Sequence, residues 1–239
     1  MEETQHARPP WGPKFVFKVA GVYLGTFIGL QVLSLAVLAL AGFDLDSIDN
    51  DSDALTILLA FSFLQQVGSI ALAVWAVQLP VSTLVAGLGL DRWRWTWIWR
   101  PALMTVALYA MVAIWSIIMQ LLGIDLLEPD SSVDESFVKG PLLIIVSFFV
   151  IVVGAPLSEE FTFRGAIFGG LLKWGFWPAA LVSGVLFGAI HFDPGSFIPF
   201  SIVGVGLAYL YWSRGSLWDN IICHAMFNFT SFLILVGSR

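Results

Sequence analysis

The 239-residue chain is poor in charge, with only 12% Asp, Glu, Lys and Arg against 58% hydrophobic residues. Soluble domains carry about 25% charged residues. The composition therefore excludes an ordinary soluble protein and predicts an integral, multi-pass membrane protein. The net charge of −6 identifies no partner, because the acids gather in two segments, 44–53 and 125–135, which are expected to be solvated loops.

Cysteine is almost absent. The single cysteine, Cys223, excludes an intramolecular disulfide and any Cys-x-x-Cys metal site. It stands next to His224, but no cation beside it would stabilise a thiolate. We therefore interpret it as a small core residue rather than a nucleophile.

The chain also lacks a basic surface of the kind that binds nucleic acid. Its one basic and aromatic stretch, residues 92–100, could in principle stack bases. Next to a predicted membrane span it is better interpreted as an interfacial anchor, with tryptophan rings at headgroup depth and arginines reaching to phosphates. We expect no nucleic-acid partner.

Long apolar runs are abundant. A spanning helix needs about 20 apolar residues, and the candidates lie at 15–41, 54–79, 101–123, 141–156, 177–191, 197–213 and 217–236. An eighth helix, 157–173, is expected to follow a break at Pro156. The predicted fold class is all-α, a polytopic membrane bundle of about eight transmembrane helices in a single domain.

The predicted organisation is a cytoplasmic N-terminal tail at 1–14, N-terminal transmembrane helices over 15–140 and a helical core at 141–239. With the N-terminus inside, most basic residues fall on the cytoplasmic side, and only Lys139, Lys173 and Arg214 fall outside. The positive-inside rule, applied to eight crossings, then predicts that the N-terminus and the C-terminus are both cytoplasmic.

Three charges interrupt the apolar sequence: Glu159, Glu160 and Arg164. A charge at the centre of a membrane helix costs about 2.5–3.5 kcal/mol on insertion scales, so these groups need partners and a role. Glu160 and Arg164 are four residues apart and are expected to form an ion pair on one helix face. Glu159 is rotated by about 100°, which leaves it as the predicted base that activates water. A charge cluster that merely caps a helix is the alternative.

Two histidines lie in apolar surroundings, and each has a partner one helical turn away: Phe187 precedes His191, and Asn228 follows His224. His191 could share the activated water with Glu159. His224 and Asn228 face the same direction and could both donate to a developing oxyanion, a contribution of about 10²–10³ in rate for each donor. A hydrogen-bonded packing role is the competing interpretation of a buried histidine.

A metal site is a second possible arrangement of the same groups. Glu159, His191 and His224 would make a His₂Glu set, a known arrangement for catalytic zinc with an open position. The chain has no His-Glu-x-x-His motif, and Asn228 would be a poor zinc ligand. Residue types alone leave both arrangements open.

Three motifs follow one another in the last third of the chain: Glu-Glu-x-x-x-Arg at 159–164, Phe-x-x-x-His at 187–191 and His-x-x-x-Asn at 224–228. Together they resemble the CPBP family, the group of CAAX prenyl endopeptidases and bacteriocin-processing or Abi-type intramembrane proteases. The resemblance covers residues 141–236. It implies an intramembrane endopeptidase of about eight helices whose active site opens toward the cytoplasm.

The resemblance also implies roles. Glu159 and His191 would activate water, and His224 and Asn228 would form the oxyanion hole. The supporting residues would be Glu160, Arg164 and Phe187. It favours a glutamate-based reaction without a cofactor; zinc, held by Glu159, His191 and His224, is the alternative.

The expected partners are the lipid bilayer and a peptide or protein substrate at the membrane, and the sequence does not indicate the oligomeric state. The alternative function is a non-catalytic membrane scaffold or immunity-type protein on the same fold. A proton-coupled transporter is a third class, since buried Glu, His and Arg also suit proton relays. The sequence shows no paired repeats or matched broken helices, which are typical of transporters.

Overall fold

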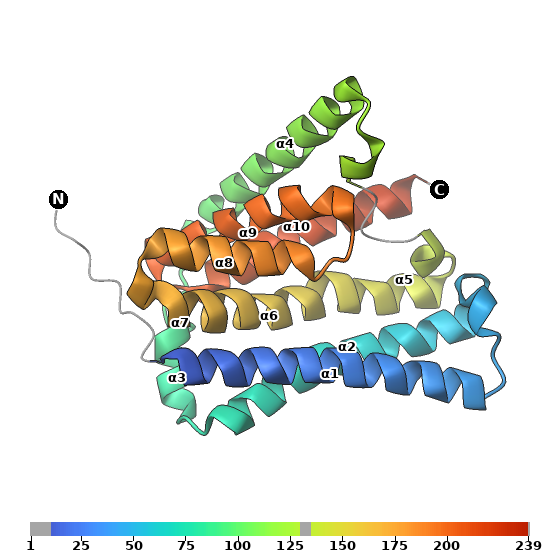
Figure 1. The fold of residues 1–239 in the computed structure, drawn as a ribbon, viewed down its shortest axis with the longest axis horizontal. Helices are drawn as coiled ribbons and strands as arrows, with labels where there is room; N and C mark the ends of the chain where they lie inside the picture. The colour runs from blue at the N-terminus through green and yellow to red at the C-terminus, as the bar shows by residue number, and fades with distance from the viewer. Residues whose placement is uncertain (1–10, 130–134, 239) are drawn as a thin grey trace.

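The computed structural model describes residues 11–129 and 135–238, and within these ranges the chain is a bundle of helices without strands (Figure 1). The helices are α1 (Pro13–Leu40), α2 (Ser52–Val77), α3 (Val81–Leu88), α4 (Trp99–Leu122), α5 (Pro141–Phe148), α6 (Ala155–Glu159), α7 (Gly169–Leu171), α8 (Phe176–Ala189), α9 (Pro194–Arg214) and α10 (Leu217–Gly237). Six helical segments in the described ranges are long and apolar enough to cross a membrane. The predicted all-α, polytopic class is confirmed. Most of the predicted tail at 1–14 and part of the second acidic segment lie outside the described residues.

Residues 141–174 form one continuous helical rod, hereafter the central rod, which includes α5, α6 and α7. The predicted break at Pro156 is therefore wrong. A proline lacks an N–H and crowds the carbonyl of the preceding turn. Here Pro156 follows a π-helical stretch, Phe149–Gly154, whose wider turns make room for the ring and let the helix continue.

The path of the chain differs from the prediction because one rod replaces two predicted helices. The helix α1 begins at one end of the bundle, and α10 finishes at the opposite end (Figure 1). The prediction of two cytoplasmic termini assumed eight membrane crossings. Because one rod replaces two of the predicted helices, this assumption no longer holds. The α8–α9 turn, which carries His191, also lies away from the end where α1 begins. The cytoplasmic opening of the site, implied by the family resemblance, stays a prediction.

The charges separate along the long axis of the bundle. The end where α1 and α10 begin, hereafter the basic end, carries most of the cations of the described residues: Lys14, Lys18, Arg92, Arg94, Arg100, Lys173 and Arg214. Lys173 and Arg214 thus share a side with the other basic residues, contrary to the prediction. The opposite end carries the acidic segment 44–53.

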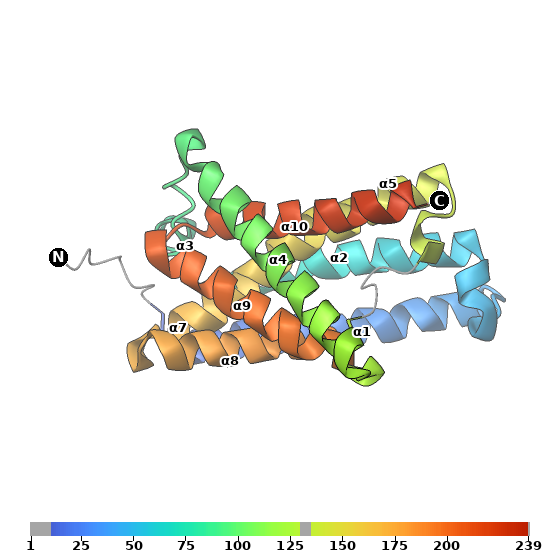
Figure 2. The same ribbon diagram turned by 90° about the horizontal axis from the view of Figure 1, so that it is seen from above.

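The central rod lies between two groups of helices. The helices α1 and α2 cover one side of it, and α8, α9 and α10 cover the other (Figures 1 and 2). Glycines let α8 and α9 pack closely against each other. A Cβ added to Gly204 would lie 2.6 Å from the Gly184 Cα, and one added to Gly188 would lie 2.5 Å from the Phe197 carbonyl oxygen. The end of α8, which leads into the turn with His191, is therefore held close to the start of α9.

Candidate active site

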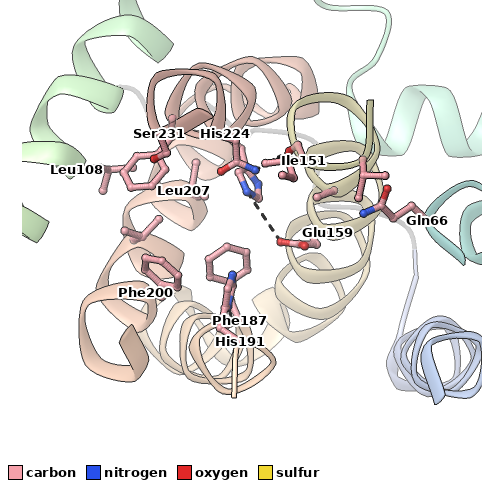
Figure 3. Close-up of a pocket in the computed structure, with 15 residues that line it drawn as sticks. Gln66, Leu108, Ile151, Glu159, Phe187, His191, Phe200, Leu207, His224 and Ser231 are labelled. Carbon is pink, nitrogen blue, oxygen red and sulfur yellow. Dashed lines mark hydrogen bonds and ion pairs between the residues drawn. The ribbon is translucent and has the colours of Figure 1, made fainter. Parts of the chain in front are cut away.

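A cavity of about 190 Å³ lies between the central rod and the helices α8, α9 and α10, with further walls from α2 and α4. The four residues predicted to act in catalysis all line it: Glu159, His191, His224 and Asn228. Figure 3 shows Glu159 and His224 pointing toward each other across the cavity, with Phe187 and His191 entering from the α8 side. The fold thus brings together three motifs that lie far apart in the sequence.

Glu160 is fully buried behind the cavity and accepts three hydrogen bonds. Its Oε1 accepts from Arg164 Nη1 at 2.8 Å and from His224 Nδ1 at 2.9 Å, and its Oε2 accepts from Asn220 Nδ2 at 3.3 Å. The ion pair expected from the four-residue spacing of Glu160 and Arg164 is present. Because the carboxylate accepts from two positions on α10, it connects the central rod to that helix.

Arg164 is also fully buried, and its surroundings fix its position from two further directions. Its Nη2 donates to the Gly204 carbonyl at 3.3 Å, and its Cζ lies 4.3 Å from the centroid of the Phe187 ring. A guanidinium over an aromatic face is stabilised by the ring quadrupole, more so when both groups are desolvated. Phe187 therefore supports the charged motif from α8.

Glu159 is placed differently from its neighbour. Its Oε2 is buried and has no hydrogen-bond partner among the described residues. The nearest ionisable atom in an ion-pair geometry is His224 Nε2, at 3.9 Å, which is too long for a direct hydrogen bond. A carboxylate only accepts, so Glu160 requires the hydrogen of His224 on Nδ1 and leaves Nε2 to face Glu159.

His191 is oriented by its own helix. Its Nδ1 donates to the Phe187 carbonyl at 2.8 Å, and its ring packs against those of Phe187 and Phe200. In the neutral imidazole this leaves Nε2 as an acceptor. His191 and Glu159 line the same cavity, so a water molecule in it has two groups that accept a proton.

Asn228 bonds to a carbonyl that the helix itself cannot satisfy. In the π-helical register the Ala155 N–H donates to the Val150 carbonyl. The next carbonyl, that of Ile151, would pair with the N–H of Pro156, which has none. Asn228 Nδ2 donates to this Ile151 carbonyl at 2.8 Å. The amide nitrogen carries a second hydrogen, which can serve a ligand in the cavity.

Sequence reasoning missed two polar residues of this region. Asn220 lies one turn before His224, as Asn228 lies one turn after it, so the spacing was a usable signal. Gln66 lines the cavity from α2, inside an apolar run, and a Cβ on Gly154 of the central rod would collide with its Oε1. A buried amide in a membrane helix indicates a contact that the sequence does not identify.

The side chains of the predicted His₂Glu zinc arrangement do not form a metal-binding group in the described structure. Among the described residues, no group of three His, Cys, Asp or Glu side chains is placed to hold a metal ion. Glu159 and His224 face each other, and the bond from His224 Nδ1 to Glu160 leaves Nε2 available to a ligand. The choice between carboxylate and metal chemistry stays a prediction for experiment.

Comparison with known proteins finds similarity over one region in the second half of the chain. Residues 141–230 match the family model described as "Type II CAAX prenyl endopeptidase Rce1-like". Over 89 residues the chain is 39% identical to a Bacillus subtilis (strain 168) protein named "Putative membrane peptidase YdiL". This alignment covers 37% of the present chain and 35% of that relative, so the chain spans about a third of the relative's length. No solved structure matches.

The matched region contains all three motifs and every residue predicted to act in catalysis. The predicted resemblance to CPBP-family intramembrane proteases is confirmed over this region. Together with the six apolar helices, it defines an integral, multi-pass membrane protein.

Proposed function

We propose that the protein is an intramembrane endopeptidase that hydrolyses peptide bonds of a membrane-associated protein or peptide. The observation that carries the proposal is the cavity, where a carboxylate with a free oxygen meets two histidines and an asparagine inside an apolar bundle. The match to a peptidase family supports the same class of reaction.

In the proposed reaction Glu159 is the general base. It takes a proton from a water molecule, whose oxygen attacks the carbonyl carbon of the scissile bond. When the carbon–nitrogen bond breaks, Glu159 returns that proton to the leaving nitrogen, so the products are a carboxylic acid and an amine. The free Oε2 of Glu159 and the acceptor Nε2 of His191 both support this role for the pair.

The developing oxyanion would be stabilised from α10. Asn228 offers the second hydrogen of its amide. His224 can donate from Nε2 only as the imidazolium, because its Nδ1 hydrogen is directed to Glu160. The Glu160 carboxylate would stabilise that imidazolium in the way that a buried carboxylate serves a catalytic histidine. Arg164 balances the charge of Glu160.

We further propose that the N-terminus and the basic end face the cytoplasm and that the C-terminus lies on the other side. Lys and Arg residues are enriched in cytoplasmic loops. In the described residues nearly all unburied basic side chains gather at the end where α1 begins, and the acidic segment 44–53 lies at the other end.

The proposed activity predicts that a substrate accumulates when the base is removed. In cells that carry Glu159→Ala, we expect one or more membrane-associated proteins to persist uncleaved, because the variant keeps the fold but cannot activate water. Quantitative membrane proteomics, with wild type and Glu128→Ala as controls, would detect the cleaved and uncleaved termini. Identical peptide patterns in all three strains would contradict the proposal. Glu128 is a suitable control because it does not line the cavity.

We propose the carboxylate chemistry without a metal cofactor, and this has its own test. The purified, active protein is expected to contain no stoichiometric zinc and to keep its activity after treatment with chelators. Asn228→Ala should then lower turnover by about 10²–10³ as the loss of one oxyanion donor. Elemental analysis that finds one zinc per chain, lost from His224→Ala together with activity, would instead support the His₂Glu arrangement.

A further inference from the structure

The basic end contains an open hollow of about 610 Å³ that takes no part in the proposed hydrolysis. It lies between the segment 91–100, which precedes and begins α4, and the α9–α10 turn. Four arginines from these two segments line it together with three tryptophans. The arginines are Arg92, Arg94, Arg100 and Arg214.

The two segments are fixed to each other by close backbone contacts. Gly89 and Gly215 both have φ of +64°, a conformation that favours glycine, and a Cβ on Gly89 would collide with the Gly215 carbonyl. Arg92 Nη1 donates to that carbonyl at 3.3 Å, and Trp218 Nε1 donates to the Leu90 carbonyl at 2.9 Å. The hollow is therefore a preorganised part of the fold.

Two of the four arginines have carboxylate partners. Arg214 Nε lies 3.1 Å from Asp219 Oδ2, and both side chains are nearly inaccessible to solvent. Arg92 Nε lies 3.8 Å from Asp91 Oδ1. The pair on Asp219 also ties the hollow to the first turn of α10, the helix that carries His224 and Asn228.

The other two arginines lie over aromatic rings and form no close ion pair. Arg94 lies over Trp97, with 5.0 Å from its Cζ to the ring centroid, and Arg100 lies over Trp99 at 5.6 Å. Among the described residues neither has a carboxylate within 4.0 Å. The hydrogen-bond donors of these two guanidinium groups are therefore not engaged by a described carboxylate and can bind an anion.

We propose that this hollow binds the phosphate of an anionic phospholipid headgroup, chiefly through Arg94 and Arg100. The planar guanidinium matches a phosphate with two parallel hydrogen bonds. Tryptophan side chains favour the depth of the headgroups, and Trp99 is more than half exposed. The basic end is assigned to the cytoplasmic side, where the leaflet carries anionic lipids. The occupant is accordingly a lipid rather than a free phosphate.

The test measures lipid binding to the full chain purified in a neutral detergent, by native mass spectrometry with phosphatidylglycerol and phosphatidylcholine. The wild-type protein should bind phosphatidylglycerol more tightly than phosphatidylcholine. Arg94→Gln/Arg100→Gln removes the charge-assisted hydrogen bonds to the phosphate and should weaken that binding by at least about tenfold. The matched control, Lys14→Gln/Lys18→Gln, removes the same charge at the same end but outside the hollow, and should bind like wild type.

Three results would overturn the proposal. The first is equal binding of phosphatidylglycerol and phosphatidylcholine. The second is an equal loss of binding in the two double variants, which would indicate only general surface charge, and the third is binding of glycerol 3-phosphate as tight as that of the lipid, which would indicate a free-phosphate site. A measurement on wild type alone covers the case in which the arginine variant fails to fold. In nanodiscs, adding phosphatidylglycerol should slow hydrogen exchange at 91–99 and 213–216 but not at 44–53, and unchanged rates would contradict the site.

Discussion

Glu159→Gln is expected to lower peptide hydrolysis by about 10²–10⁴-fold, the contribution of a positioned general base, while the protein stays folded. The amide that replaces the carboxylate has nearly the same volume and breaks no hydrogen bond of the buried Oε2, because that atom has no partner among the described residues. Turnover of a fluorogenic peptide library by the protein in nanodiscs gives the rate, and the unfolding midpoint gives the stability.

Two variants sharpen this experiment. Glu128→Gln makes the same chemical change outside the cavity, and should leave turnover at the wild-type level. His191→Gln removes the second group that can take a proton from the proposed water, and should also lower turnover although Glu159 is intact. Glu159→Gln protein that cleaves at the wild-type rate would refute the assigned base. A large loss of stability in this variant would show that Glu159 has a structural role instead.

The apolar runs and the helical spacing of charged residues predicted much of this molecule. Runs of about 20 apolar residues located the long helices, because a helix in a bilayer must satisfy its backbone internally and face lipid on its outer side. The spacing of Glu160 and Arg164 predicted their ion pair, since residues four apart share a helix face. These signals are local and need no knowledge of tertiary contacts.

The continuity of the central rod could not be predicted in the same way. A proline normally interrupts a helix. Here the π-helical stretch before Pro156 makes room for its ring. The carbonyl of Ile151, left without a helical partner, is then satisfied by Asn228 from α10. One misplaced break changed the number of crossings, and with it the predicted side of the C-terminus. The convergence on one cavity likewise depends on packing between distant segments.

Glu160→Gln is expected to destabilise the protein by about 3–5 kcal/mol, the cost of leaving a buried charge without its partner. Arg164 would keep its positive charge inside the bundle without its ion-pair partner, while its contacts to the Gly204 carbonyl and the face of Phe187 remain. Activity should fall as well, because His224 Nδ1 would lose the carboxylate that orients it. Unfolding in mixed detergent and sodium dodecyl sulfate micelles, followed by tryptophan fluorescence, measures the free energy of unfolding.

A double-mutant cycle separates the charge from the packing. Arg164→Met removes the cation, so Glu160→Gln/Arg164→Met leaves no uncompensated charge and should be less destabilised than the sum of the two single variants. If instead the losses add, the two residues stabilise the fold independently and the buried ion pair is not the unit that holds it. Because His224 lacks its carboxylate in the double variant too, stability should recover there without a recovery of turnover. That separation would assign the pair to the fold and the bond from His224 to Glu160 to catalysis.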